Sequence, residues 1–218
     1  MGLQTVLYRS DDILRRAEML RVDEAKLETD IGYRFYYVSD FVDMTARDVE
    51  AIRKSAGLLV PMLPTIVSVI YTKLFQYDCT KRHFLMASVG YRGDVPYDMD
   101  ELTLEHPIML YRRKHLEEYF EAVLLSEWDS NLVLYMDIIG AMHTKDAGTK
   151  AISIPLVQMN AMMGFLHVAI TDVIMSMSIS EVDKHNMVIA YSKFLSIQQD
   201  FIVRHYECEE EEDQGEED

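Results

Sequence analysis

Residues 129–143 read DSNLVLYMDIIGAMH, and this stretch decides the fold class. Its apolar residues recur at intervals of three and four, which is the spacing that one face of an α-helix requires. They are Leu132, Tyr135, Met136 and Ile139. A β-strand would alternate apolar and polar residues at every second position, and no segment of the chain shows a clear alternation of that kind. We therefore predict a helix from Asp129 to about His143, within an all-α protein.

The segments before this stretch predict further helices. Thr45, with Asp48 three residues later, is typical of a helix N-terminus, and Pro64 suits the first turn of the next helix because its missing N–H costs nothing there. An aromatic-rich stretch at Ile31–Phe41 has no clear period, and residues 90–96 predict a loop. The predicted helices are Ser10–Val22, Thr45 toward Pro61, Pro64 to about Gln76, a short turn-like helix at Thr80–Ala87, and Glu105–Leu125.

The segments after His143 predict a loop and two long antiparallel helices. Lys145–Ser153 is typical of a loop, and Ser153 with Pro155 predicts the start of a strongly apolar helix that runs to about Ser176. Ser180 with Asp183 predicts the cap of a last helix that ends near Tyr206. Helices of this length with short connections predict a layered all-α domain in which a pocket forms between crossing helices.

Composition indicates one globular domain. The chain has 218 residues, of which 49% are hydrophobic. Every run of 18 residues contains at least one charged residue or proline. We therefore expect no membrane span, no secretory leader and no membrane partner. Its two cysteines, Cys79 and Cys208, indicate reduced thiols rather than a disulfide framework. We expect a cytoplasmic protein with a single domain at residues 1–206.

The charge of the chain is concentrated at its C-terminus. The formal net charge is −16, and nine of the carboxylates lie in residues 207–218. Like charges repel one another, so we predict that this segment is a disordered acidic tail. The acidic balance argues against nucleic acid as a partner, since phosphate binding depends on a basic surface.

His143 stands out among the seven histidines. Most helical histidines are ordinary surface or half-buried residues. His143 instead closes a helix whose neighbouring residues are Ile138, Ile139 and Met142, and a loop follows it at once. An imidazole at such a helix end can point into an adjoining cavity and bind iron, and the apolar helices nearby can wall a haem slot.

Three blocks of sequence carry a resemblance to a known family. Residues 41–75, FVDMTARDVEAIRKSAGLLVPMLPTIVSVIYTKLF, resemble the opening helices of protoglobins and of the related globin-coupled sensor domains. Residues 139–143, IGAMH, resemble the end of that family's proximal helix, and the segment from Ile154 to Phe165 resembles the start of its next helix. The order and spacing of the blocks carry the resemblance. It implies a globin fold with an additional N-terminal helix.

The resemblance also implies a cofactor and residue roles. His143 matches the axial ligand of the iron of haem b, and Tyr71 matches the distal tyrosine, whose hydroxyl can hydrogen-bond a gas ligand. Leu116 and Phe165 match residues that line the family's pocket. Ile70 stands where archaeal relatives have a tryptophan beside the distal tyrosine, and Leu116 replaces a phenylalanine. Gas access and affinity therefore need not follow those of the relatives.

Three further residues are candidates for the pocket by their position. Arg112 and His115 lie just before Leu116 on the long predicted helix, so either can approach the distal side, where His115 is a candidate sixth ligand. A solvent-facing or propionate-facing role is the alternative for both. Met142 is next to His143 and can touch haem, although the methionines are most simply explained as core filler.

The implied function is reversible binding of O₂, CO or NO for sensing, binding or storage. The resemblance implies a homodimer formed through the last two helices, and a sensor role would need a separate signalling partner. Haem redox chemistry is compatible with such a site, but no reductase segment accompanies it, so enzymatic activity is left undecided.

Three other readings compete with a haem globin. A ferritin-like carboxylate enzyme would need Glu-x-x-His pairs, and a Ser/His/Asp hydrolase would need a Gly-x-Ser-x-Gly turn on a sheet; the sequence has neither pattern. The strongest rival is a globin fold without haem that acts as a protein-interaction or signalling module. Such a protein would keep the apolar helices without needing His143 or Tyr71.

Overall fold

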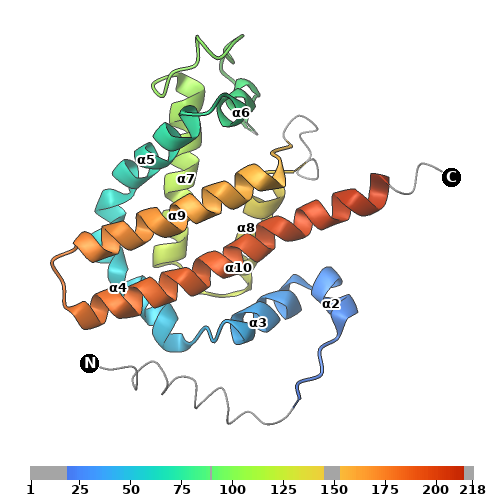
Figure 1. Cartoon of the computed structure of the whole chain (residues 1–218), viewed down its shortest axis with the longest axis vertical. Coiled ribbons are helices and arrows are strands. Elements are labelled where there is room, and N and C mark those ends of the chain that lie inside the picture. Colours follow the sequence, from blue (N-terminus) through green and yellow to red (C-terminus); the bar gives the residue numbers. More distant parts are fainter. Residues whose placement is uncertain (1–18, 89, 145–152, 214–218) are drawn as a thin grey trace.

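The computed structural model describes residues 19–88, 90–144 and 153–213, which form helices joined by turns and loops (Figure 1). No strand occurs within these ranges, so the prediction of an all-α protein is confirmed. The elements are α2 (Glu24–Thr29), α3 (Ile31–Phe41), α4 (Ala46–Leu59), the 3-10 turn η1 (Val60–Met62), α5 (Leu63–Phe75), α6 (Asp78–Lys81), η2 (Arg82–Leu85), α7 (Pro107–Leu125), α8 (Ser130–Ala141), α9 (Leu156–Ser176) and α10 (Glu181–Asp213).

The caps predicted from the sequence are present. Thr45 and Asp48 form a reciprocal capping box at the start of α4, and the Asp183 backbone N–H donates to the Ser180 hydroxyl at the start of α10 (3.1 Å). Pro64 lies in the first turn of α5, as expected. These features follow from local sequence because each involves residues at most three positions apart.

The N-terminal region differs from the prediction. Residues 19–22 of the helix predicted at Ser10–Val22 are not helical, and residues 10–18 lie outside the described residues. The first described helix is α2, where the carboxylate of Asp23 accepts a hydrogen bond from the Lys26 backbone N–H. The aromatic stretch without a clear period is α3. Its Phe35 packs against Phe201 of α10, with ring centroids 6.2 Å apart.

Helix α10 organises the fold. Figure 1 shows it between α9 and α3, with α9 running antiparallel beside it, and α4 and α8 also contact it. Its residues Phe194, Ile197 and Phe201 are fully or almost fully buried, so this helix supplies the centre of the core.

The last helix continues past its predicted end. It reaches Asp213 rather than stopping near Tyr206, so residues 207–213, predicted as part of a disordered tail, are helical. Extending an existing helix requires no new nucleation, and glutamate has a good helix propensity, which together favour this continuation over a break.

The buried carboxylate of the α4 capping box provides a test of fold stability. Asp48 accepts hydrogen bonds from Thr45 and from Lys193 of α10 (2.8 Å). Burial raises the pKa of Asp48, but the hydrogen bonds from Lys193 and Thr45 outweigh it, so the pKa lies below its ordinary value. The ionised form is therefore the one that the fold stabilises.

We expect Asp48→Asn to lower the free energy of unfolding by about 2–3 kcal/mol at pH 7, because the half-buried Lys193 ammonium loses its charged partner. A lowered folded-state pKa contributes stability above the unfolded pKa, near 3.9, and this contribution is lost as pH falls through the folded pKa. Urea unfolding at pH 7 and near pH 3 should show the difference shrinking in acid. Glu50→Gln, which alters an exposed pair with Lys54, is the control and should cost about 0.5 kcal/mol or less; equal losses would contradict the prediction.

Candidate functional site

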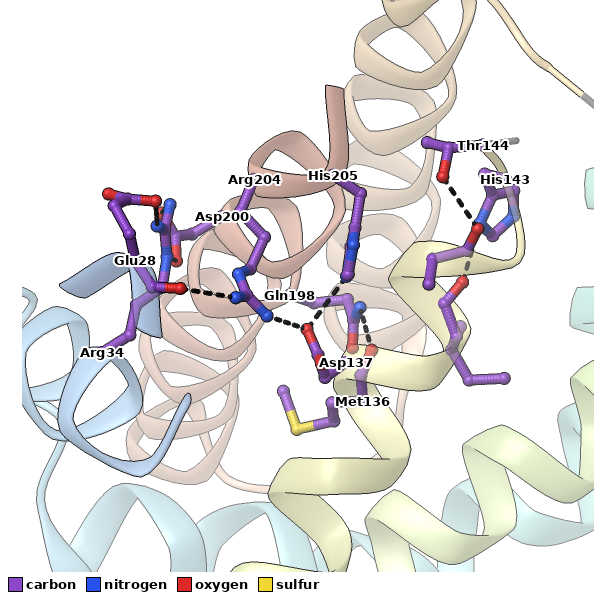
Figure 2. A network of polar contacts seen from close by, with 12 residues as sticks. Glu28, Arg34, Met136, Asp137, His143, Thr144, Gln198, Asp200, Arg204 and His205 are labelled. Carbon is purple, nitrogen blue, oxygen red and sulfur yellow. Dashed lines mark hydrogen bonds and ion pairs between the residues drawn. The ribbon is translucent and has the colours of Figure 1, made fainter. Parts of the chain in front are cut away.

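His143 lies in the turn that follows α8. This helix begins where the Asp129 carboxylate accepts hydrogen bonds from the backbone N–H groups of Asn131 (2.9 Å) and Leu132 (3.2 Å). It ends at Ala141, so the helix predicted to reach His143 stops two residues earlier. The imidazole turns back along the helix, and its Nδ1 lies 2.8 Å from the carbonyl oxygen of Ile139 (Figure 2).

This contact defines the chemistry of the imidazole. A carbonyl oxygen only accepts, so Nδ1 carries the proton and donates it, which leaves the lone pair on Nε2. Burial lowers the pKa of His143 below its ordinary value, although hydrogen bonding to the backbone of Ile139 and Gly140 acts in the opposite direction. The ring is therefore neutral at pH 7. A neutral imidazole whose Nδ1–H is held by a backbone carbonyl is the form that binds a metal through Nε2.

Helix α8 approaches the backbone of α10 closely at Gly140. A Cβ atom at this position would lie 2.9 Å from the Phe201 carbonyl carbon and closer still to its oxygen, so only glycine fits. One turn earlier, Asp137 accepts hydrogen bonds from Arg204 (2.6 Å) and His205 (2.9 Å) of α10 (Figure 2). The end of α8, and with it His143, is therefore positioned against α10.

Tyr71 is a buried tyrosine whose hydroxyl makes no hydrogen bond to the residues that the structure describes. It lies on α5 beside the fully buried Ile70, and its ring packs against that of Phe84 with centroids 5.6 Å apart. Two other buried tyrosines have partners, since Tyr191 bonds Ser55 and Tyr119 bonds Gln198. Within the described residues, no hydrogen-bond partner is recorded for the Tyr71 hydroxyl. Burial raises the pKa of Tyr71 to about 12, so this hydroxyl remains protonated and able to donate.

Arg112 of α7 connects the surroundings of Tyr71 with the turn that contains His143. Its guanidinium carbon lies 5.3 Å from the centroid of the Phe84 ring, and its Nη2 donates to the Met86 carbonyl (2.7 Å). Burial is the largest influence on the pKa of Tyr71 and of His143, and the positive charge of Arg112 acts on both as well. Of the predicted residues, Arg112 is therefore the one whose charge acts on both Tyr71 and His143.

The remaining candidates are placed less centrally. Leu116 and Phe165 are half-buried against the core, and Ile70 is fully buried. His115 is exposed and bonds Glu118 (3.1 Å), and the Met142 side chain is 39% exposed, so neither joins the Tyr71–Arg112–His143 group.

Sequence reasoning missed the two residues that hold Arg112. Phe84 packs against both Arg112 and Tyr71, and the Met86 carbonyl accepts from Arg112. Both belong to the segment predicted as a short turn-like helix. No spacing in that segment signals their role, because the contact with α7 spans more than twenty residues of chain.

An apolar cavity lies elsewhere in the core. It is lined by residues of α4, α5, α7, α9 and α10, among them Leu63, Phe120 and Tyr191. None of the eight predicted site residues lines it. The Tyr71–Arg112–His143 group is therefore distinct from this cavity.

The helices and this arrangement define a globin fold with a half-buried, neutral histidine in the turn after α8. The chain belongs to the protoglobin family, whose family model matches residues 32–212. It is also similar in fold to the globin domain of the Geobacter sulfurreducens globin-coupled sensor, with a TM-score of 0.59 at 13% sequence identity over 78% of this chain and 96% of that chain. No curated protein matches it significantly in sequence. The resemblance stated from the three sequence blocks is thus confirmed, and so is the all-α globin fold.

Proposed function

We propose that this protein binds haem b and, through it, reversibly binds a diatomic gas. The observation that carries the proposal is the His143 imidazole, which is half-buried and neutral, with Nδ1 held by Ile139 and Nε2 left to bind iron. Membership of the protoglobin family and the fold shared with a globin-coupled sensor support it. A haem-free interaction module would have no need to prepare an imidazole in this way.

Each residue of the proposed site has a separate task. Haem, when bound, supplies an iron that binds O₂, CO or NO. His143 would hold it through Nε2, and the Tyr71 hydroxyl would donate a hydrogen bond to the gas. Ile70, Leu116 and Phe165 would exclude water and so strengthen that hydrogen bond, because an electrostatic interaction is stronger in an apolar setting.

A hemin titration tests the proposal directly. We expect the purified protein to take up one equivalent of hemin with a sharp Soret band, and the reduced form to give a shifted band under CO. Protein that stays colourless at stoichiometric hemin, while remaining folded by circular dichroism, would favour the haem-free module.

The distal hydroxyl gives a second prediction. We expect Tyr71→Phe to speed O₂ dissociation about tenfold or more, since a hydrogen bond to a ligand that carries partial negative charge is worth roughly 1.5–3 kcal/mol. CO accumulates less charge, so its dissociation should change less. Flash photolysis and stopped-flow measurements give both rates. Tyr191→Phe, which removes a buried hydroxyl bonded to Ser55, is the control; an unaltered O₂ rate in Tyr71→Phe would remove Tyr71 from the site.

The same proposal includes the assembly and location of the protein. Val157, Val168 and Met175 of α9 are 73%, 60% and 49% exposed, and such apolar side chains favour a homodimer through α9 and α10. A sensor role would then act through a separate signalling partner. By length and composition, residues 46–75 and Leu156–Ser176 are apolar enough to cross a membrane, and each also contributes several buried residues to the globin core. We therefore propose a cytoplasmic location.

A further inference from the structure

Arg112 contains a buried donor without a partner. Among the side chains that the structure describes, two buried polar atoms have no hydrogen bond, and Arg112 Nε is one of them. The other, the Ser39 hydroxyl, is uncharged, so its cost is smaller. An unsatisfied N–H on a charged guanidinium is unfavourable enough that it indicates a function.

The positive charge of Arg112 is also uncompensated. Arginine stays protonated in proteins, and the described side chains include no carboxylate paired with it. The buried or half-buried cations Arg34, Lys193 and Arg204 do have carboxylate partners, namely Asp200, Asp48 and Asp137. The half-buried Lys73, Lys81 and Arg113 have no carboxylate partner among the described residues either, but only Arg112 among these cations also has a buried side-chain donor without a hydrogen bond.

The surroundings hold the guanidinium in place without neutralising it. Nη2 is held by the Met86 carbonyl, and one face of the group lies over the Phe84 ring. The Tyr71 ring packs on the same Phe84, and the Tyr71 hydroxyl has no recorded partner among the described residues. Two unused donors, one of them cationic, therefore flank a single aromatic side chain, and His143 lies within the electrostatic reach of that cation.

We propose that Arg112 makes the proposed haem site a receptor for a small inorganic anion, such as fluoride, azide or nitrite, which accepts a hydrogen bond from Arg112 Nε. The inference rests on the proposed haem function, because the anion would bind beside the proposed haem, where it could accept a hydrogen bond from Arg112. A haem propionate is the less suitable partner. Propionates reach toward water, whereas Arg112 Nε is buried and shares its environment with the buried Tyr71.

The test uses the full chain loaded with ferric haem, and the readout is the shift of the haem absorption spectrum during fluoride and azide titrations. We expect Arg112→Gln to weaken the affinity for both anions about tenfold or more, as a lost charge-assisted hydrogen bond of roughly 1.5–3 kcal/mol requires. Arg112→Lys keeps the charge but not the planar donor group, so its anion affinity should lie between those of the wild type and of Arg112→Gln. Lys114→Gln is the matched control, since it removes the same charge from an exposed position of α7 that is paired with Glu118, and it should change anion affinity less than threefold.

The hemin dissociation rate, measured on the same proteins, separates the outcomes. Weaker anion binding with unchanged hemin retention and unchanged CO affinity supports the inference. Unchanged anion affinity in Arg112→Gln overturns it, and faster hemin loss in that variant would then identify a propionate as the partner. Wild-type protein that takes up no hemin would refute the proposed haem function, which the titration shows before any variant is compared.

Discussion

We expect His143→Ala to abolish stoichiometric hemin uptake and the Soret band that accompanies it. The substitution removes a half-buried, neutral imidazole whose Nε2 carries a lone pair that no described residue uses. Losing the residue that merely orients a metal ligand costs roughly 10–100-fold in metal affinity, so losing the ligand itself should cost more. Spectrophotometric hemin titration of the variant and the wild type measures the difference.

His115→Ala is the matched control for this experiment. It removes a histidine that is exposed on α7 and hydrogen-bonded to Glu118, so hemin uptake should remain at the wild-type level. His143→Gly supplemented with free imidazole should recover part of the band, because the small base can enter the space that the side chain vacates. Full hemin uptake by His143→Ala, or loss of uptake by His115→Ala, would assign the iron to a different histidine.

The second large effect is expected at Gly140, where α8 meets α10. In Gly140→Ala, the new methyl group would collide with the Phe201 carbonyl, which is backbone and cannot rotate away. We expect the free energy of unfolding to fall by about 2 kcal/mol or more, since overpacking of this kind typically costs 1–3 kcal/mol. Any relief requires the two helices to separate, which would also move the turn that holds His143. We therefore expect weaker hemin binding together with the loss of stability.

Two other helical glycines provide the control. A Cβ atom at Gly57 in α4 or Gly164 in α9 would meet nothing within 4 Å. Gly57→Ala and Gly164→Ala should therefore stabilise the protein by about 0.5–1 kcal/mol, the usual gain from replacing glycine in a helix. Urea unfolding of the haem-free proteins compares all three variants. Wild-type stability in Gly140→Ala would show that the contact with Phe201 is looser than the structure indicates.

Much of the fold was predictable because its signals are local. The Thr45–Asp48 box, the Ser180–Asp183 cap and the proline in the first turn of α5 each act over a few residues. Helix ends without such signals were predicted less well. The end of α8 before His143 and the continuation of α10 to Asp213 depend on packing and on propagation from a formed helix, and neither leaves a mark at the boundary.

The candidate site was likewise predictable only in part. His143 was found from its place after an apolar helix and from the family resemblance, and Tyr71 from the resemblance. Arg112 was a candidate only by its position in the helix, and its uncompensated charge was not foreseen. That charge state depends on whether a carboxylate lies nearby in space, and an acidic chain gives every reason to expect one.

For this protein, the order of residues along the chain was enough to establish the helical class, the capped helix starts and the histidine that follows α8, because each depends on periodicity or on neighbours within one turn. Three features arose only when distant helices packed together: the fit of Gly140 against Phe201, the imbalance of charge around Arg112, and the shared contact of Arg112 and Tyr71 with Phe84. Their physical cause is close packing, which brings together residues that are far apart in the chain and keeps water from satisfying what they leave unpaired.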